Sequence, residues 1–143
     1  MLEIATQFKK NKLKLTPQRL AILNFLRNTK SHPSAHEIYE SIYPTFPTIS
    51  LATIYKTLKT LAQVKLINEL NLGEGNFRYD GKTYTHSHFY CNKCNKIEDI
   101  EIHSLPLPSI KNALERDTKN KIDSYEMYLF GVCEECLLRE NKL

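Results

Sequence analysis

The four cysteines of this chain form two doublets, Cys91-x-x-Cys94 and Cys133-x-x-Cys136, separated by 38 residues. Four thiolates are enough to complete a tetrahedral zinc shell, with each doublet on a tight turn. Paired doublets of this kind are typical of metal sites in a reducing compartment. The alternatives are a redox switch built from these thiols and a set of buried free cysteines. The pattern favours a structural zinc ion, and a closed shell leaves no position for catalysis.

Capping signals divide the first half of the chain into short helices. Thr16-Pro17 predicts the start of one helix, and Ser34-x-x-Glu37 is a capping box for a second. Ser50 caps a third, LATIYKTLKTLAQ, whose apolar residues lie on one face. Two candidate strands follow, LINEL and NFRYD, joined by the turn residues GEGN. Three short helices and a hairpin predict a winged helix-turn-helix, with a small bundle carrying solvated lysines as the alternative.

The second half of the chain predicts a different kind of domain. From Ser87 to Ile102 the pattern indicates two strands folded about the first cysteine doublet. PSIKNALERDTK predicts a helix, YEMYLFGV a strand and EECLLREN a terminal helix. A unit of about 60 residues buries little apolar surface, so we expect zinc and dimerisation to stabilise it. The expected fold is α+β, with a winged-helix DNA-binding domain over residues 1–83 and a small α/β dimerisation and zinc-binding domain over residues 84–143.

Charge is distributed unevenly along the chain. Residues 1–85 contain 12 Lys and Arg against 6 Asp and Glu, whereas residues 86–143 contain 8 against 10. A basic first half suits binding to a polyanion. The outer face of the third predicted helix carries small, hydroxylated and basic side chains, which suit the major groove of DNA. No apolar run reaches the roughly 20 residues of a membrane span, and the N-terminus lacks the apolar core of a secretory signal. We therefore expect a cytoplasmic protein that binds double-stranded DNA.

A His-x-His motif, His86 and His88, precedes the first cysteine doublet. On a strand, two residues at this spacing point to the same side. Because the cysteines already have partners, this pair needs other ligands, and the candidates are Asp80, Asp99 and His32. Each candidate also has an ordinary structural explanation, as a turn former, a solvated strand charge and a loop residue respectively. From the pattern alone, a second metal site stays an open alternative.

Six segments, TPQRLAIL, SHPSAHEIY, SLATIYKTL, FRYDG, HSHFYCNKC and GVCEEC, occur in this order along the chain. Together they resemble the ferric uptake regulator (Fur) family over nearly the whole sequence, and within it the peroxide-responsive repressor branch. That branch binds its regulatory ion through three histidines and two aspartates, which correspond here to His32, Asp80, His86, His88 and Asp99. The iron-sensing branch usually has Glu at the place of Asp99 and further histidines where this chain has Thr85 and Tyr125.

The resemblance implies a homodimeric, metal-dependent transcriptional repressor that senses hydrogen peroxide and is not an enzyme. Zn²⁺ is expected at the cysteines, and Fe²⁺ or Mn²⁺ at the histidines and aspartates, because imidazole and carboxylate suit these ions. A ligand histidine, His32 or His86, is expected to take up oxygen, and DNA is released by the oxidised or metal-free protein. The alternatives are an iron-availability sensor without peroxide chemistry and a metalloenzyme that activates water or consumes peroxide.

DNA contacts are expected from the start of the first predicted helix and from the third. The peroxide branch often has Asn, and iron sensors have Arg, directly after the Tyr of the recognition helix. In this chain Lys56 follows Tyr55, which matches neither branch, so the operator sequence is not predicted. The expected DNA-binding residues are Thr16, Gln18, Arg19, Ser50, Thr53, Tyr55, Lys56 and Lys59.

Overall fold

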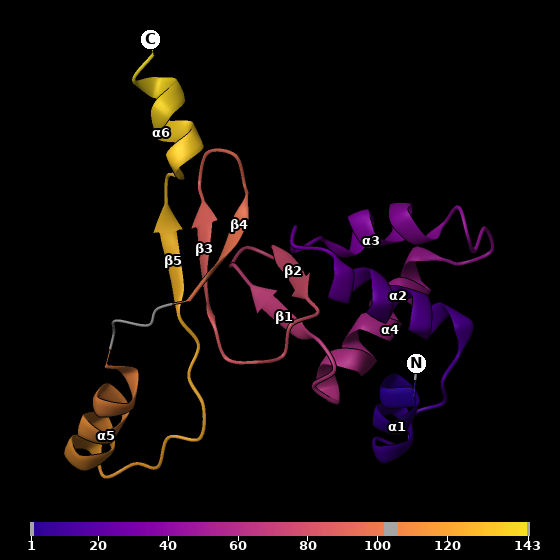
Figure 1. Cartoon of the computed structure of the whole chain (residues 1–143), viewed down its shortest axis with the longest axis horizontal. Helices are drawn as coiled ribbons and strands as arrows, with labels where there is room; N and C mark the ends of the chain where they lie inside the picture. The colour runs from indigo at the N-terminus through magenta and orange to yellow at the C-terminus, as the bar shows by residue number, and fades with distance from the viewer. Residues whose placement is uncertain (1, 102–105, 143) are drawn as a thin grey trace. The chain divides into compact units, whose positions relative to one another are not determined.

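The computed structural model describes residues 2–101 and 106–142. The chain divides into two compact units, Met1–Tyr84 and Thr85–Leu143 (Figure 1). Helices dominate the first unit and a small sheet the second, so the predicted α+β class is confirmed. Within the two described ranges, no helix combines the length and the apolar character that crossing a bilayer requires.

The first unit contains four helices and a two-stranded hairpin. Their order is α1 (Leu2–Lys10), α2 (Pro17–Asn28), α3 (Ala35–Ile42), α4 (Leu51–Gln63), β1 (Asn68–Asn71) and β2 (Phe77–Asp80). The strands are antiparallel, with Asn68 opposite Asp80. Helices α2, α3 and α4 and the hairpin confirm the predicted winged helix-turn-helix elements, whereas α1 was not predicted. Phe8 is the one buried residue of α1, which has nine residues. An apolar pattern this short does not identify a helix from the sequence.

A reciprocal capping box begins α3, as predicted. The Ser34 N–H donates to Glu37 Oε2 at 2.7 Å, and the Glu37 N–H donates to Ser34 Oγ at 3.3 Å. The bond from the Ser34 N–H holds the pKa of the Glu37 carboxyl below its usual value. Thr16 caps α2 with its side chain, which accepts from the Arg19 N–H at 3.3 Å. These local bonds satisfy backbone N–H donors that have no intrahelical partner at the start of a helix, and they fix where each helix begins.

One face of each helix builds the core of the first unit. The helical aliphatic side chains that are at most 1% exposed are Ile22, Leu23, Leu26, Ile38, Ile54, Leu58 and Leu61, and Ile67 after α4 is buried to the same degree. Phe8 of α1 and Tyr79 of β2 belong to the same cluster. Three of these side chains come from α4, which confirms its predicted inner face. The opposite face of α4 is therefore left to solvent.

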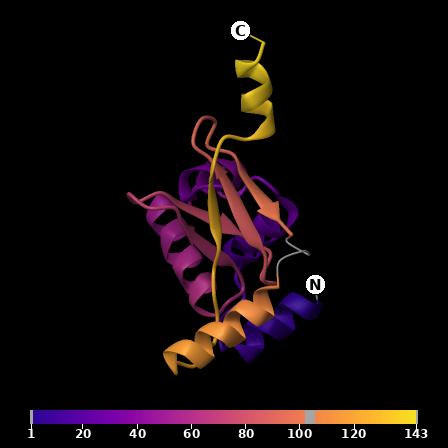
Figure 2. The same cartoon turned by 90° about the vertical axis from the view of Figure 1, so that its left-hand side faces the viewer.

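The second unit is built on a three-stranded sheet of order β4-β3-β5. Its elements are β3 (Ser87–Cys91), β4 (Ile97–Ile100), α5 (Leu107–Thr118), β5 (Tyr128–Gly131) and α6 (Glu134–Glu140). β3 pairs antiparallel with β4 and parallel with β5, and Figure 2 shows β5 alongside β3 with α6 beyond its end. The predicted strands and helices are confirmed, except that Ile102, the expected end of the second strand, lies outside the described residues.

The buried core of the second unit is small. In the described residues, Cys91, Cys133 and Cys136 form a buried cluster with Phe89 and Val132 packed against them, and Ile97 of β4 is buried as well. No residue of α5 is buried. A core of this size contributes little hydrophobic stabilisation, so this unit needs another source of stability.

Candidate metal centres

The four cysteine sulfurs come together at one end of the sheet. Cys91 ends β3 and Cys94 lies in the following turn, whereas Cys133 precedes α6 and Cys136 lies in its first turn. The Sγ atoms of Cys91 and Cys136 are 3.9 Å apart, those of Cys94 and Cys133 are 3.7 Å apart, and all four lie within 4.8 Å of one another. Zn–S bonds of about 2.3 Å in a tetrahedron place sulfurs roughly 3.8 Å apart. The cluster therefore has the dimensions of a zinc site with four cysteine ligands.

The charges of this cluster also fit a divalent cation. The backbone N–H of Cys133 donates to Cys91 Sγ at 3.3 Å, and it lowers the pKa of the Cys91 thiol to about 6. Contact with the Cys133 side chain raises the pKa of the Cys136 thiol to about 12. Four sulfurs this close do not all ionise without a cation, because neighbouring thiolates repel one another. A bound cation removes that repulsion and allows all four to ionise, so the donor set fits Zn²⁺.

Two lysines in the turn of the first doublet contact α6. The Lys96 Nζ lies 2.8 Å from Glu98 Oε1 and 3.0 Å from Glu135 Oε1, and these two carboxylates raise the pKa of the Lys96 ammonium group. Lys93 pairs with Glu140. All of these side chains are substantially exposed, where ion pairs contribute little to stability. A metal ion at the sulfurs is therefore the stronger link between the two turns.

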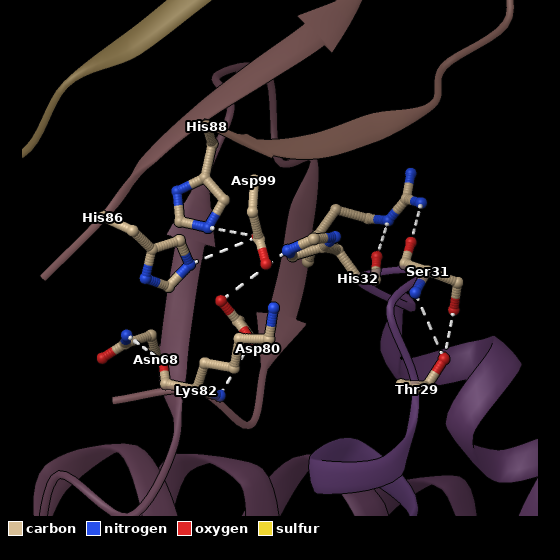
Figure 3. Close-up of polar contacts among 10 residues, drawn as sticks. Thr29, Ser31, His32, Asn68, Asp80, Lys82, His86, His88 and Asp99 are labelled. Atoms are coloured by element: carbon tan, nitrogen blue, oxygen red, sulfur yellow. Dashed lines mark hydrogen bonds and ion pairs between the residues drawn. The ribbon is translucent and has the colours of Figure 1, made fainter. Parts of the chain in front are cut away.

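In the first unit, His32 and Asp80 form a buried pair. His32 lies in the loop between α2 and α3, and Asp80 ends β2. Their side chains are 3% and 5% exposed, and His32 Nε2 lies 3.6 Å from Asp80 Oδ2 (Figure 3). The backbone N–H of Lys82 donates to Asp80 Oδ1 at 2.8 Å, which fixes the orientation of the carboxylate. An imidazole and a carboxylate in this arrangement provide two donors for a metal ion. Two donors are only part of a complete coordination shell.

In the second unit, one carboxylate contacts two imidazoles. His88 on β3 lies directly opposite Asp99 on β4, and His86 immediately precedes β3. Asp99 Oδ1 lies 3.2 Å from His86 Nε2 and 3.6 Å from His88 Nε2, and the two ring centroids are 4.5 Å apart. Figure 3 draws both contacts of Asp99 as dashed lines. Neighbouring ligands of an octahedral ion with bonds near 2.1 Å are roughly 3 Å apart. These three side chains therefore have the spacing of ligands to a common ion.

Helix α4 and its N-cap carry five of the eight residues expected to contact DNA. Tyr55 is 52% exposed, and Lys56 and Lys59 are exposed beside it. Ser50 caps the helix by accepting from the Thr53 N–H at 3.1 Å. The remaining expected contacts lie at the start of α2: Thr16, Gln18 and Arg19. The structure leaves this surface accessible, and its role in DNA binding stays a prediction.

Three residues next to Asp80 were not identified from the sequence. The Arg78 guanidinium contacts the loop of His32 through a hydrogen bond of 2.5 Å from Nε to the His32 carbonyl. Gly81 packs against the backbone of α2, and Lys82 supplies the N–H that orients Asp80. The sequence places Arg78 on the same side of a strand as Asp80, because residues two apart share a side, but it gives no sign of the contact with the His32 loop.

Comparison with known proteins gives a consistent picture over nearly the whole chain. The sequence profile of the Ferric uptake regulator family matches residues 10–130. The Transcriptional regulator PerR of Clostridium acetobutylicum is 46% identical over 136 residues, which cover 95% of this chain and 97% of that protein. The Peroxide-responsive repressor PerR of Staphylococcus epidermidis is 36% identical over 134 residues, covering 94% and 88%.

Solved structures of the same kind share the fold. The crystal structure of the Campylobacter jejuni peroxide stress regulator matches with a TM-score of 0.74 and 34% identity, covering 92% of this chain and 98% of that one. The Helicobacter pylori ferric uptake regulator matches with a TM-score of 0.78 and 26% identity, covering 94% and 89%. The expected resemblance, including that to the peroxide-responsive branch, is thus confirmed. By profile, sequence and structure, this chain belongs to the ferric uptake regulator family.

Proposed function

We propose that this chain is a metal-dependent transcriptional repressor that senses hydrogen peroxide. The observation that carries the proposal is the Asp99 carboxylate, which contacts the imidazoles of both His86 and His88. The names of the relatives in Clostridium acetobutylicum and Staphylococcus epidermidis support it, since both are PerR proteins. The repressor acts in the cytoplasm, where its operator DNA lies, and its role is regulation rather than catalysis.

In this proposal the two groups of His and Asp side chains share one regulatory ion. The first unit offers two donors and the second offers three, and neither number completes an octahedral shell. An Fe²⁺ or Mn²⁺ ion held by all five joins the DNA-binding unit to the dimerisation unit. The two winged helices of a homodimer then stand at a fixed separation that suits two half-sites. The proposed ligands are His32, Asp80, His86, His88 and Asp99.

Without the ion, the connection between the two units is flexible. DNA binding must then also order this connection. A difference of about 3 kcal/mol between the two states changes operator occupancy by roughly 100-fold, which is within the usual range of allosteric coupling. The metal-free protein therefore leaves DNA. The same holds for protein in which a ligand histidine has been damaged.

Oxidation of a histidine supplies the peroxide signal. A bound Fe²⁺ would lend an electron to peroxide and recover it as the ring is oxidised, a cycle that Mn²⁺ does not readily support. The imidazole of His32 or His86 lies beside the ion in this proposal. A ring C–H of that histidine becomes C–OH with one oxygen atom of H₂O₂, and the other oxygen atom leaves as water. The oxidised ring is a poorer ligand, so the shared shell loses one of its donors. The manganese form is expected to bind the operator and repress transcription, yet to respond poorly to peroxide.

Treating the Fe²⁺-loaded protein with H₂O₂ is expected to add the mass of one oxygen atom to a peptide that holds His32 or His86. Peptide mass mapping measures the modification, and operator binding measured on the same sample should fall with it. The Mn²⁺-loaded protein is the matched control and should stay unmodified and bound. Unmodified histidines, with oxidation confined to Cys or Met, would contradict the proposal and favour the iron-availability sensor. Sustained consumption of peroxide would instead favour a metalloenzyme.

Replacing Tyr55 or Lys56 by Ala is expected to weaken operator binding by about 1–3 kcal/mol, the range of a good base contact. Both side chains project from the exposed face of α4, so zinc content and dimerisation should stay unchanged. Affinity for operator and for unrelated DNA is measured at one salt concentration, because phosphate contacts depend strongly on salt. Lys121→Ala, which matches the charge change of Lys56→Ala on an exposed residue of the second unit, is the control. Unchanged operator affinity in both α4 variants would exclude this helix as the reader.

The exposed apolar side chains of the second unit support the proposed homodimer. Ile110 and Leu114 on α5 are 45% and 48% exposed, and Leu129 and Phe130 on β5 are 39% and 55% exposed. These exposed apolar side chains, in a unit with so small a buried core, are the surface that an interface would cover. A second copy of the same unit would cover them.

A further inference from the structure

We propose that Arg78 is a positioning residue for His32, holding the loop of this histidine in place so that the ligand stays next to Asp80. The inference rests on the proposed regulatory metal site. Arg78 lies on β2, and its Nε donates to the His32 carbonyl at 2.5 Å. Its Nη2 donates to the neighbouring Ser31 carbonyl at 3.4 Å. One guanidinium thus binds two successive carbonyls of the loop, and Figure 3 shows the side chains of Ser31 and His32 on that loop.

The loop needs such a restraint because His32 has an unfavourable backbone conformation. Its φ of 50° lies in the left-handed region, where the Cβ of a non-glycine residue crowds its own backbone. The next residue is Pro33, whose ring further restricts the residue before it and favours extended conformations there. A free loop of this sequence would therefore turn the imidazole elsewhere. Contacts from outside the loop must hold the observed conformation.

Strand β2 supplies these contacts and also carries the second ligand. Beside the Arg78 side chain, the Tyr79 N–H donates to the Pro33 carbonyl at 3.0 Å. Arg78 and Asp80 are two residues apart, so both side chains lie on the same side of the strand. The backbone of one strand therefore fixes the distance between the Asp80 carboxylate and the loop that presents the His32 imidazole. The half of the metal site in the first unit is therefore positioned by β2 and its contacts with the loop.

The planar fork of arginine is what this role requires. A lysine retains the positive charge but offers one compact ammonium group, which does not bind two neighbouring carbonyls in a fixed geometry. Losing the fork lets the loop leave its left-handed conformation, and metal binding must then order it again. Groups that orient metal ligands in this way typically change metal affinity by about 10- to 100-fold when removed.

The test is a Mn²⁺ titration of the full-length, zinc-loaded protein without DNA, with free Mn²⁺ measured by electron paramagnetic resonance. Arg78→Lys and Arg78→Met are each expected to weaken Mn²⁺ binding about 10-fold or more. Without Mn²⁺, the free energy of unfolding of the zinc-loaded variants in urea is expected to stay close to that of the unchanged protein. The control is Arg27→Lys, because Arg27 lies in the same unit and its Nη2 donates to Gln7 Oε1 at 2.8 Å. This control should bind Mn²⁺ normally.

The His32→Ala variant separates failure of this inference from failure of the proposed function. If His32→Ala binds Mn²⁺ as well as the unchanged protein, the proposed regulatory site is wrong, and the positioning role is wrong with it. If His32→Ala loses Mn²⁺ but both Arg78 variants bind it normally, only the positioning role is overturned. A loss of metal-free stability as large as the loss of affinity assigns Arg78 to general folding and overturns the role too. Unchanged Mn²⁺ affinity with a smaller salt dependence of DNA binding would assign Arg78 to phosphate contact instead.

Discussion

Cys133→Ser is expected to release the bound zinc and unfold the second unit, while the helices of the first unit remain. The main buried cluster described in the second unit consists of three of the four cysteines with Phe89 and Val132 packed against them. Binding of structural zinc contributes on the order of 10 kcal/mol in small domains, and a serine hydroxyl does not replace a thiolate in the shell. Zinc content by mass spectrometry and domain structure by nuclear magnetic resonance measure the two effects together.

Val132→Ala is the matched control for this experiment. Val132 is next to Cys133 and packs against the sulfur cluster without being a ligand. Its truncation removes apolar contact and should leave the zinc bound, at a cost of about 1 kcal/mol or less for a partly buried side chain. A strong chelator should reproduce the Cys133→Ser result in the unchanged protein. A zinc-free Cys133→Ser protein with an intact second unit would show that the metal is not what stabilises this unit.

Local signals explain why most helices of the first unit could be predicted. Pro17 at the first position of α2 and the box between Ser34 and Glu37 act within one turn, so the sequence carries them complete. Helix α1 has no such signal. It is held by tertiary packing of Phe8, and that packing depends on residues of other helices that lie far along the chain. Secondary structure that depends on distant partners is not visible in a local pattern.

The two metal centres differ in the same way. Each cysteine doublet brings its two sulfurs together on one turn, so the spacing itself predicts the zinc site. His32 and Asp80 are 48 residues apart in the sequence, and no spacing rule connects them. The family resemblance identified them, and the structure then brings this pair together. The role of Arg78 could not be predicted, because it depends on the backbone conformation of His32, which becomes visible only in the folded loop.

Gly81→Ala is expected to destabilise the first unit by about 3 kcal/mol, the upper range for an overpacked site. A Cβ atom on Gly81 would lie 2.5 Å from the Leu26 carbonyl carbon and 2.6 Å from both the Leu26 oxygen and the Arg27 nitrogen. All three are backbone atoms of α2, which cannot rotate away as a side chain can. Either the hairpin end moves or α2 does. Urea unfolding of the zinc-loaded protein, followed by the helical signal, measures the loss.

Gly73→Ala separates this steric effect from the general cost of replacing a glycine. Gly73 has a φ of 87°, and a Cβ there would meet no atom within 4 Å. Its replacement should cost about 1–2 kcal/mol through backbone conformation alone, and it should leave Mn²⁺ affinity unchanged. Equal stability of the two variants would contradict a close approach of Gly81 to α2.

Metal binding adds a second, independent measure of the Gly81 variant. Gly81 lies between Asp80 and Lys82, and the Lys82 N–H orients the Asp80 carboxylate through a bond of 2.8 Å. A shift of the backbone at Gly81 moves this carboxylate, so Mn²⁺ affinity and stability should fall together in Gly81→Ala. In Arg78→Lys the affinity should fall while the metal-free stability is kept, because that side chain restrains a loop and not the core. Normal Mn²⁺ affinity in a destabilised Gly81→Ala protein would show that the Asp80 carboxylate is positioned by something other than the packing of β2 on α2.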